Sequence, residues 1–518
     1  MTKLNVPPFC NEPLTDYNDP VNRQLMEAAL ATVKSQLGQT YPLVIGGEEI
    51  YLEDTLVSVN PANPDEVVGR FPKATVELGN RAIEAAAKAF ETWQYTPYTE
   101  RVRLVLAGAE LLRQRKHEFS AWMVYEVGKS WPEADADTAE TIDFLEYYAR
   151  QMLRLGAPQD LVRIDGEQND LEYVPLGVGV VIPPWNFPGA IMAGMSSAAI
   201  VSGNTIVLKP ASTSPVIAAQ FHRIMTEVGL PPGVFNFLVG PGGKIGDALV
   251  DHPKTRFVAF TGSMEVGLRI HERAAKTSPG QIWVKRTVLE MGGKDAVVVD
   301  ESADLDAAAK GIVSSAFGFQ GQKCSAGSRA IIHERVYDRI LPKILAEADR
   351  ITIGDPTDPT TYMGPVVDDK AFNKIREYID IGKSEGKLVH GGESWGPGYF
   401  IEPTIFADVA PDARIAQEEI FGPVLAVIKG QDWEDLLRIA NGTIYGLTGA
   451  VYSQDESHLQ DAYQRYHVGN LYFNRKCTGA MVGVHPFGGF NMSGTDSKAG
   501  GPDYLLLFTQ AKSIARKV

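Results

Sequence analysis

The chain of 518 residues carries 49 Lys and Arg against 64 Asp and Glu, a formal net charge of −15 that argues against nucleic acid or an anionic membrane as a partner. Its three cysteines form no even-numbered framework and its nine histidines include no pair at metal-ligand spacing, so neither a disulfide scaffold nor a metal site is expected. Such a chain predicts two domains with smaller appendages in a reducing, cytoplasmic compartment.

The N-terminal part is predicted to be mainly helical. Residues 1–40 have the pattern of an irregular arm followed by a helix, and their start lacks the apolar core of a signal peptide. Residues 41–59 predict short strands with a turn at Gly46-Gly47, and helical periodicity then continues over 75–153. Residues 161–174 alternate around Asp165-Gly166, which predicts a hairpin.

Strands and helices alternate from residue 177 onward, as in a parallel sheet with crossover helices. The apolar runs lie at 177–182, 205–208, 234–239 and 256–260. Ser214 followed by Pro215 predicts an N-cap and one helix start. No charged residue occurs over 173–208, but Pro183, Pro184, Pro188 and the Gly203-Asn204 turn interrupt this stretch. It therefore predicts buried strands and a buried helix, because a membrane span needs about 20 uninterrupted residues.

A second alternating block begins near Thr287 and ends near Gly489. Its apolar runs lie within 287–300, at 329–332 and at 425–428, with helices between them. The tail over 503–510 predicts an apolar strand at the chain end, and such a strand needs a partner edge. A neighbouring subunit is one supplier of that edge.

Cys324 stands in a small, flexible segment, Gly-Gln-Lys-Cys-Ser-Ala-Gly-Ser-Arg at 321–329. A lone cysteine is ordinarily a small buried hydrophobe. The small residues around this one allow close backbone approach, and their N–H groups would face a developing oxyanion. Cys324 is therefore the candidate nucleophile of a covalent enzyme, a role that requires a stabilised thiolate.

Two further polar residues follow predicted strand ends, where open α/β sheets place their sites. Glu290 follows a short apolar run and offers a carboxylate that would activate water; the alternative is a strand-end residue before a turn. Asn186, in the proline-bounded segment 184–188, offers an amide donor that would complete an oxyanion hole; the alternative is a rigid turn with core aromatics.

The usual dinucleotide fingerprint, Gly-x-Gly-x-x-Gly, is absent, since the glycines of 240–246 have the wrong spacing. Segments 209–212 and 261–263 are the remaining candidates for cofactor binding. The second opens a predicted helix whose N-terminus would meet phosphate. A turn followed by a helix cap is the alternative for each.

Taken in order, seven segments resemble the aldehyde dehydrogenase superfamily over nearly the whole chain. They are Pro-Trp-Asn-Phe-Pro (184–188), Leu-Lys-Pro-Ala (208–211), Phe-Thr-Gly-Ser (260–263), Leu-Glu-Met-Gly-Gly-Lys (289–294), Gly-Gln-Lys-Cys (321–324), Glu-Glu-Ile-Phe-Gly-Pro (418–423) and Pro-Phe-Gly-Gly (486–489). The resemblance implies an α/β fold of three parts. They are a Rossmann-type cofactor domain (1–160 and 177–288), an α/β catalytic domain (289–489) and a small β oligomerisation flap (161–176 and 490–518).

The resemblance also implies a mechanism and a set of site residues. The Cys324 thiolate would add to an aldehyde, Asn186 and the Cys324 N–H would hold the oxyanion, hydride would pass to NAD, and Glu290 would activate water to hydrolyse the thioester. The residues implied in cofactor binding are Lys209, Ser212, Ser263, Glu419, Phe421, Trp185 and Gly262. Relatives selective for NAD often have glutamate at the position of Ser212, so serine there predicts that NADP is tolerated alongside NAD.

Within the superfamily the closest likeness is to the branch that oxidises glutamate γ-semialdehyde to glutamate in proline breakdown. The residues implied in binding that substrate are Ser325, Gly479, Ala480, Phe187, Phe487 and Glu140. Aromatic walls and convergent N–H donors suit an aldehyde with an apolar middle and a carboxylate head. The alternatives are a dehydrogenase of succinic or aminoadipic semialdehyde, or a binding protein that only retains the fold. A homo-oligomer, a dimer or an assembly of dimers, is expected.

Overall fold

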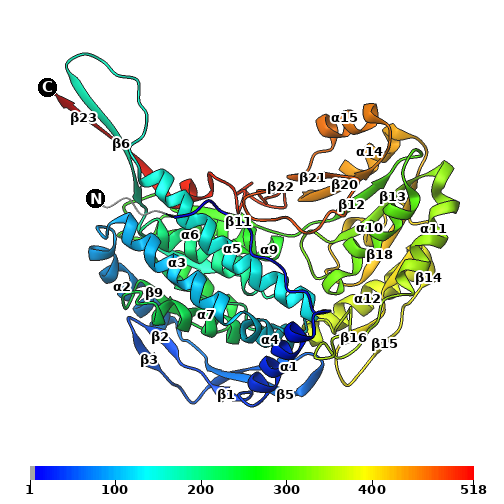
Figure 1. Ribbon diagram of the computed structural model, residues 1–518, viewed down its shortest axis with the longest axis horizontal. Helices are drawn as coiled ribbons and strands as arrows, with labels where there is room; N and C mark the ends of the chain where they lie inside the picture. The colour runs from blue at the N-terminus through cyan, green and yellow to red at the C-terminus, as the bar shows by residue number, and fades with distance from the viewer. Residues whose placement is uncertain (1–5) are drawn as a thin grey trace.

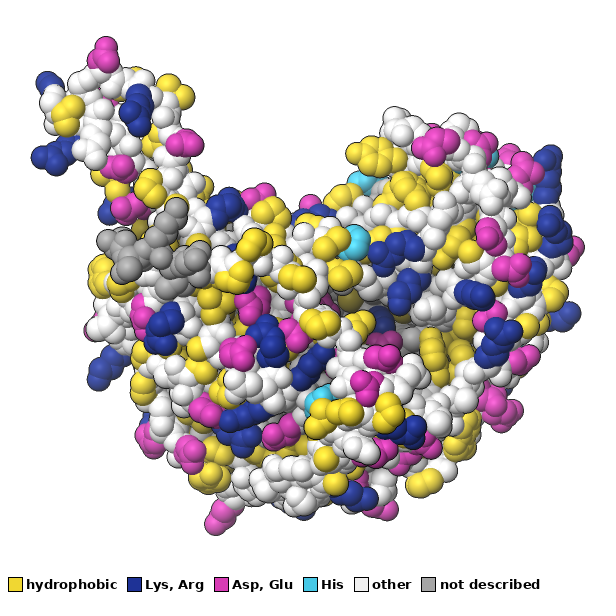
Figure 2. Space-filling model, viewed as in Figure 1, with side chains coloured by type: hydrophobic (Ala, Val, Ile, Leu, Met, Phe, Trp, Pro, Cys, Tyr) yellow, Lys and Arg dark blue, Asp and Glu magenta, His cyan; other side chains and the backbone are white. Residues whose placement is uncertain are grey.

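The computed structural model describes residues 6–518. Two seven-stranded sheets lie in separate halves of the molecule, and each is flanked by helices (Figure 1). Basic and acidic side chains are interspersed over the face seen in Figure 2, where no extended basic surface gathers. Four small sheets lie outside the large ones. One joins β1 (Gln39–Thr40), β5 (Asn63–Pro72) and β4 (Thr55–Asn60), and the other three are the pairs β15 (Ser394–Trp395) with β16 (Phe400–Ile401), β19 (Tyr445–Gly446) with β22 (Phe490–Asn491), and β6 (Glu167–Pro175) with β23 (Thr509–Lys517).

The first sheet is parallel through five strands and ends in an antiparallel hairpin. Its order is β11 (Arg286–Glu290), β10 (Thr255–Thr261), β7 (Val178–Ile182), β8 (Thr205–Leu208), β9 (Phe235–Phe237), β2 (Leu43–Ile45) and β3 (Glu48–Ile50). The predicted parallel strands and the turn at Gly46-Gly47 are confirmed; both glycines have positive φ, as a two-residue hairpin turn requires.

Helices enclose this sheet and make most of the larger hydrophobic core. They are α1 (Pro20–Lys34), α2 (Val76–Trp93), α3 (Tyr98–Gln114), α4 (Lys116–Val127), α5 (Trp131–Gly156), α6 (Ala190–Val201), α7 (Pro215–Glu227), α8 (Asp247–Asp251) and α9 (Met264–Ala275). Every residue of α6 except the half-buried Ile191 is buried, so the helix predicted within the uncharged stretch is interior. Within residues 6–518, no helix is long and apolar enough to cross a membrane.

Helix α7 begins at Pro215 as predicted, but its cap differs from the prediction. The carboxylate of Glu126 accepts hydrogen bonds from the N–H groups of Val216 (2.7 Å) and Ile217 (2.9 Å), in place of the expected Ser214 side chain. Burial raises the pKa of Glu126 to about 7. The cap was not predictable from local sequence because Glu126 lies on α4, far away along the chain.

The second sheet is parallel except for one edge strand. Its order is β14 (Lys387–His390), β17 (Thr404–Ala407), β18 (Val424–Gly430), β13 (Gly327–His333), β12 (Asp295–Val299), β20 (Thr448–Tyr452) and β21 (Asn470–Phe473). Its helices are α10 (Leu305–Phe317), α11 (Glu334–Ala348), α12 (Asp369–Glu385), α13 (Arg414–Gln417), α14 (Trp433–Asn441) and α15 (Glu456–Arg465).

The predicted hairpin within 161–174 is wrong. The strand β6 (Glu167–Pro175) pairs antiparallel with β23 (Thr509–Lys517), the last strand of the chain, from Pro175 opposite Thr509 to Glu167 opposite Lys517. Together they form the arm that projects from the molecule in Figure 1. The predicted terminal strand is also misplaced, because Tyr504–Phe508 is a short 3-10 helix buried against the core and the strand starts at Thr509. The partner edge therefore comes from the same chain.

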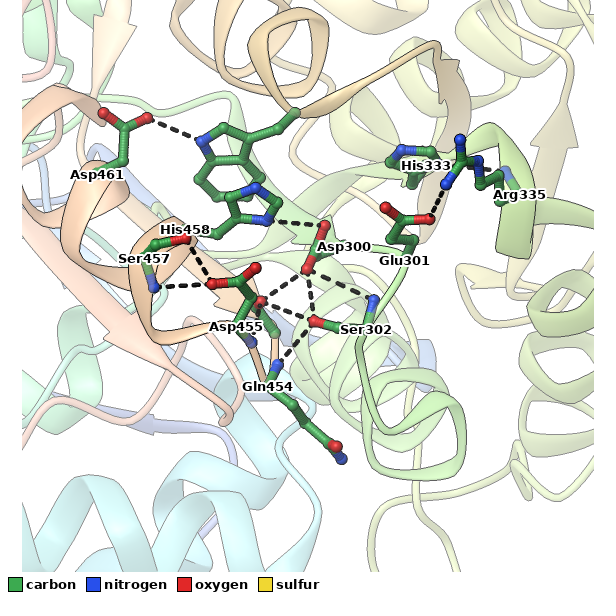
Figure 3. Close-up of polar contacts among 12 residues, drawn as sticks. Asp300, Glu301, Ser302, His333, Arg335, Gln454, Asp455, Ser457, His458 and Asp461 are labelled. Carbon is green, nitrogen blue, oxygen red and sulfur yellow. Dashed lines mark hydrogen bonds and ion pairs between the residues drawn. The ribbon is translucent and has the colours of Figure 1, made fainter.

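One crevice of the second sheet is closed by its own side chains. Strand β12 lies between β13 and β20, and the strands that follow it in the sequence are placed on both of its sides. Open parallel sheets often bind ligands at such a switch point. Here the buried carboxylate of Asp300 accepts from the hydroxyls of Ser302 and Ser453 and lies 3.2 Å from Nδ1 of His458, whose ring stacks on Trp433 (Figure 3). These contacts join the segments that follow β12 and β20 at the carboxyl ends of the two strands.

Candidate active site

A cavity of about 410 Å³ opens between the two sheets. Its wall combines the carboxyl ends of β7 and β10, the crossing segment after β11 and the segments that precede β13 and β18. Seven residues predicted for the site line it: Trp185, Asn186, Gly262, Ser263, Cys324, Glu419 and Phe421. Segments scattered over more than 230 positions of the sequence thus converge on one space, as the ordered motifs predicted.

Cys324 lies on a tight turn between α10 and β13. Phe319 and Gln320, just upstream, have φ values of 49° and 55°, a left-handed conformation that is strained for residues with a side chain. Gly321 continues the bend at φ 64°, and a Cβ there would lie 2.5 Å from the carbonyl oxygen of Gly422. This packing forces the chain to turn sharply before Cys324 and brings the thiol to the cavity wall.

The thiol is in an environment that favours its neutral form. Burial raises the pKa of Cys324 well above its ordinary range, and the carboxylates of Asp295, Glu419 and Glu290 add to the rise. A nucleophilic thiolate would therefore need a positive charge brought into the cavity. An oxidised nicotinamide ring supplies such a charge.

Asn186 provides the amide donor that the sequence predicted. Its side chain is 3 % exposed, and Nδ2 donates to the carbonyl oxygen of Gln322 at 3.0 Å. This bond fixes the amide beside Cys324, the candidate nucleophile, and uses one of its two hydrogens. The second remains for an oxygen of a substrate bound at Cys324.

Glu290 ends β11 and is held by the C-terminal segment. One carboxylate oxygen accepts from the Ser497 hydroxyl at 2.6 Å and the Ser497 N–H at 3.2 Å; the other accepts from the Gly489 N–H at 3.1 Å. Burial raises the pKa of Glu290 to about 7, although these donors favour its ionised form. Glu290 is not among the residues that line the cavity. Sequence reasoning missed Ser497, whose segment carries no motif.

Glu419 is fixed by the glycine pair that follows Glu290. The Gly293 N–H donates to the Glu419 carboxylate at 3.0 Å, and a Cβ on Gly292 would lie 2.3 Å from that carboxylate. Lys374 donates to the Glu419 carbonyl at 2.9 Å, and burial raises the pKa of the Glu419 carboxyl. The glycines are therefore required for close approach. Lys374 was not predicted from the sequence.

The residues fit a dinucleotide. The Lys209 ammonium is 4 % exposed and donates only to the Pro210 carbonyl, at 3.3 Å, so it retains hydrogens for a ribose hydroxyl; burial lowers its pKa to about 8. Ser263 caps the N-terminus of α9, where the N–H groups of the first turn would face a bound phosphate. Trp185 and Phe421 pack edge to face with centroids 5.5 Å apart. Lys209 and Ser212 lie outside the cavity lining, although Ala211 is part of it.

The residues predicted for the substrate do not line this cavity. Ser325 adjoins Cys324, and its carbonyl accepts from the Cys477 thiol at 3.3 Å, which brings the segment of Gly479 and Ala480 close to the nucleophile. Phe487 pairs with Ala499 next to the segment that holds Glu290.

Phe187 and Glu140 lie at a buried charge network that sequence reasoning missed. The Lys129 ammonium lies 4.1 Å from the centre of the Phe187 ring and 3.1 Å from the Asp137 carboxylate, and both charged side chains are fully buried. Burial raises the pKa of Glu140 to about 8, and the negative charge of Asp137 contributes to the rise. Glu133, one turn before Asp137 on α5, pairs with Lys323 at 2.7 Å. The network thus reaches the residue before the nucleophile.

Comparison with known proteins agrees with this site. Residues 51–514 match the aldehyde dehydrogenase family. The 1-pyrroline-5-carboxylate dehydrogenase of Geobacillus kaustophilus is 58 % identical over 511 residues, 98 % of this chain and 99 % of that protein. The structure of 1-pyrroline-5-carboxylate dehydrogenase from Thermus with bound NAD has a TM-score of 0.97 and 52 % identity, with full coverage of both chains. Proline utilization A from Bdellovibrio bacteriovorus has a TM-score of 0.97 and 45 % identity over 98 % of this chain and 53 % of its own.

Proposed function

The chain belongs to the aldehyde dehydrogenase family, and we propose that it oxidises L-glutamate γ-semialdehyde, the open form of 1-pyrroline-5-carboxylate, to L-glutamate in proline degradation. The observation that carries the chemistry is the meeting of Cys324, Asn186 and the residues suited to a dinucleotide in one cavity. The relatives named for this activity carry the substrate assignment, because they match over the full length of the chain.

The first half of the reaction is a covalent capture. The Cys324 thiolate adds to the aldehyde carbon, and the oxyanion is stabilised by the free hydrogen of Asn186 Nδ2 and by the Cys324 N–H. When bound, NAD accepts the hydride that leaves this carbon, which converts the thiohemiacetal to a thioester. Lys209 and Glu419 would hold the riboses, and the N-terminus of α9 at Ser263 would hold the pyrophosphate.

The second half is hydrolysis. Glu290, with a pKa of about 7, is ionised in a large fraction of molecules at neutral pH and can take a proton from water. The hydroxide attacks the thioester carbon, the Cys324 thiolate leaves, and the acid is released. Gly489 and Ser497 orient the carboxylate for this step.

Substrate choice is tested by comparing kcat/KM for glutamate γ-semialdehyde, succinic semialdehyde and aminoadipic semialdehyde in one buffer with NAD. We expect the glutamate semialdehyde to lead by at least about tenfold, because a site built for a substrate's polar head rejects analogues that lack it. A higher value for either competitor would assign the chain to that other semialdehyde.

The cofactor range is tested at Ser212, which lies next to the cavity-lining Ala211. We expect Ser212→Glu to lower kcat/KM for NADP by about tenfold or more and for NAD by less than about threefold, because a carboxylate repels the 2′-phosphate and accepts bonds from the 2′-hydroxyl. Thr213→Glu serves as the matched charge control. Equal losses of kcat/KM with NAD and NADP would show that Ser212 does not contact the adenosine ribose.

We infer a homo-oligomer from the projecting arm. Leu161, Val162 and Ile164 precede β6 and are 38 %, 91 % and 56 % exposed, an apolar surface that a second subunit would cover. Gel filtration with light scattering on Val162→Asp tests this: we expect the molar mass of the particle to fall below that of the wild type. An unchanged molar mass would show that the arm is not the subunit interface. All three cysteines are free, which fits the reducing cytoplasm.

A further inference from the structure

Arg475 binds the backbone of its own loop. It follows β21 and starts the segment that runs back toward the first sheet and ends at β22 (Phe490–Asn491) (Figure 1). Its Nη2 donates to the carbonyl oxygens of Thr478 at 2.8 Å and Gly479 at 3.0 Å, and its Nε donates to that of Lys476 at 3.3 Å. One guanidinium thus orients three peptide groups of a single turn.

The N–H groups of those peptides must point the opposite way, because C=O and N–H are antiparallel in a trans peptide. The first pair confirms the geometry: the Lys476 carbonyl faces Arg475, and the Cys477 N–H donates to the Ser315 hydroxyl at 3.2 Å on the other side. The next two N–H groups, of Gly479 and Ala480, have no hydrogen-bond acceptor within residues 6–518. They form an adjacent pair of free donors.

The loop conformation and its neighbours suit an anion. Gly479 has φ 78°, and successive N–H groups around a left-handed residue converge to make a small anion-binding concavity. The Cys477 thiol donates to the Ser325 carbonyl, which ties this turn to the residue after the nucleophile. The Arg475 guanidinium itself lies 4.4 Å from the centre of the Tyr472 ring, which limits its movement.

We propose that Arg475 is a positioning residue: by holding the carbonyls of Thr478 and Gly479, it keeps the N–H groups of Gly479 and Ala480 turned toward the α-carboxylate of the substrate. This inference rests on the proposed function, since it assigns the residue that prepares the carboxylate site. Without Arg475 the two peptides can rotate, and the substrate must order them on binding. The free energy needed for that ordering weakens the binding of the carboxylate and leaves the rate of the chemical step unchanged.

The test compares Arg475→Met with Lys476→Met, which removes the same charge from the next residue. We expect Arg475→Met to raise the KM for glutamate γ-semialdehyde and the inhibition constant of glutamate together, by about 10- to 100-fold, because bonds to a charged group are strong. The kcat, the KM for NAD and kcat/KM for propanal, which has no carboxylate, should each change by less than about threefold. Lys476→Met should leave all of these within about threefold.

A second variant separates orientation from charge. Arg475→Lys keeps the charge but cannot reach several carbonyls with a fixed fork, so its KM should lie closer to that of Arg475→Met than to the wild type. Three results would overturn the proposal: equal loss with propanal, wild-type behaviour of Arg475→Lys, or an effect of Lys476→Met as large as that of Arg475→Met. Failure of the proposed function is recognised separately, because the wild-type enzyme itself would then prefer succinic or aminoadipic semialdehyde, or show no preference for glutamate semialdehyde over propanal.

Discussion

Replacement of Cys324 by alanine is expected to lower kcat/KM for aldehyde oxidation by at least about 10⁴-fold, the scale on which loss of a covalent nucleophile acts. Of the three thiols only that of Cys324 lies on the cavity wall; Cys10 is exposed near the N-terminus, and the side chain of Cys477 is buried. The measurement is the initial rate of NADH formation at saturating NAD over a range of glutamate γ-semialdehyde concentrations, which gives kcat/KM. Titration of NAD by quenching of tryptophan fluorescence should show cofactor binding within about threefold of the wild type, since the cavity keeps its shape.

Cys10→Ser is the matched control, because its thiol is exposed and should leave the rate of NADH formation unchanged. The raised thiol pKa adds a second expectation. Without cofactor, modification of Cys324 by iodoacetamide should be slow at pH 7, and it should become faster when NAD brings positive charge beside the thiol. Residual aldehyde oxidation by Cys324→Ala near the wild-type rate would contradict the nucleophile assignment.

The parallel sheets, and the convergence of seven expected site residues on one cavity, were predictable because local signals agreed with tertiary structure. Apolar runs bounded by glycine and proline became β7, β8 and β10, and the polar residues Asn186 and Ser263, which follow β7 and β10, line the cavity. The prediction of a hairpin over 161–174 was wrong because the local signal did not agree with the tertiary structure. Alternation shows that a strand such as β6 has two faces, but it does not identify the strand that will pair with it. Here the partner lies more than 330 positions away along the chain.

The contacts that orient the site residues and shift their pKa values could not be predicted from the sequence. Ser497 on Glu290, Lys129 beneath Phe187 and Arg475 on its loop act through hydrogen bonds or ring contacts set by tertiary packing. None belongs to a motif with a fixed spacing that reveals the partner. The pKa of Glu290 is a clear case, because burial raises it while donors from a distant segment oppose the rise. Both effects depend on the folded environment.

Replacement of Glu290 by glutamine is expected to separate the two halves of the reaction. Capture of the aldehyde and hydride transfer use Cys324 and Asn186, so rapid mixing should show a burst of NADH close to one per active site. Hydrolysis lacks its base, so steady-state turnover after the burst should be about 10²- to 10⁴-fold slower than in the wild type. The carboxylate now accepts from the backbone N–H groups of Gly489 and Ser497, and the single oxygen of glutamine can accept from only one of them. The free energy of unfolding should therefore fall by about 1–3 kcal/mol.

The same residue sets a pH dependence whose direction follows from its pKa of about 7. The carboxylate is the active form, so hydrolysis should rise as pH increases through about 7 and fall as Glu290 becomes protonated below it. The Ser497 hydroxyl stabilises the ionised form, so Ser497→Ala should move the midpoint of this rise to higher pH while leaving the NADH burst intact. Loss of the burst itself in Glu290→Gln would show that Glu290 acts before hydride transfer, as the base for Cys324, and would refute its assignment to hydrolysis alone.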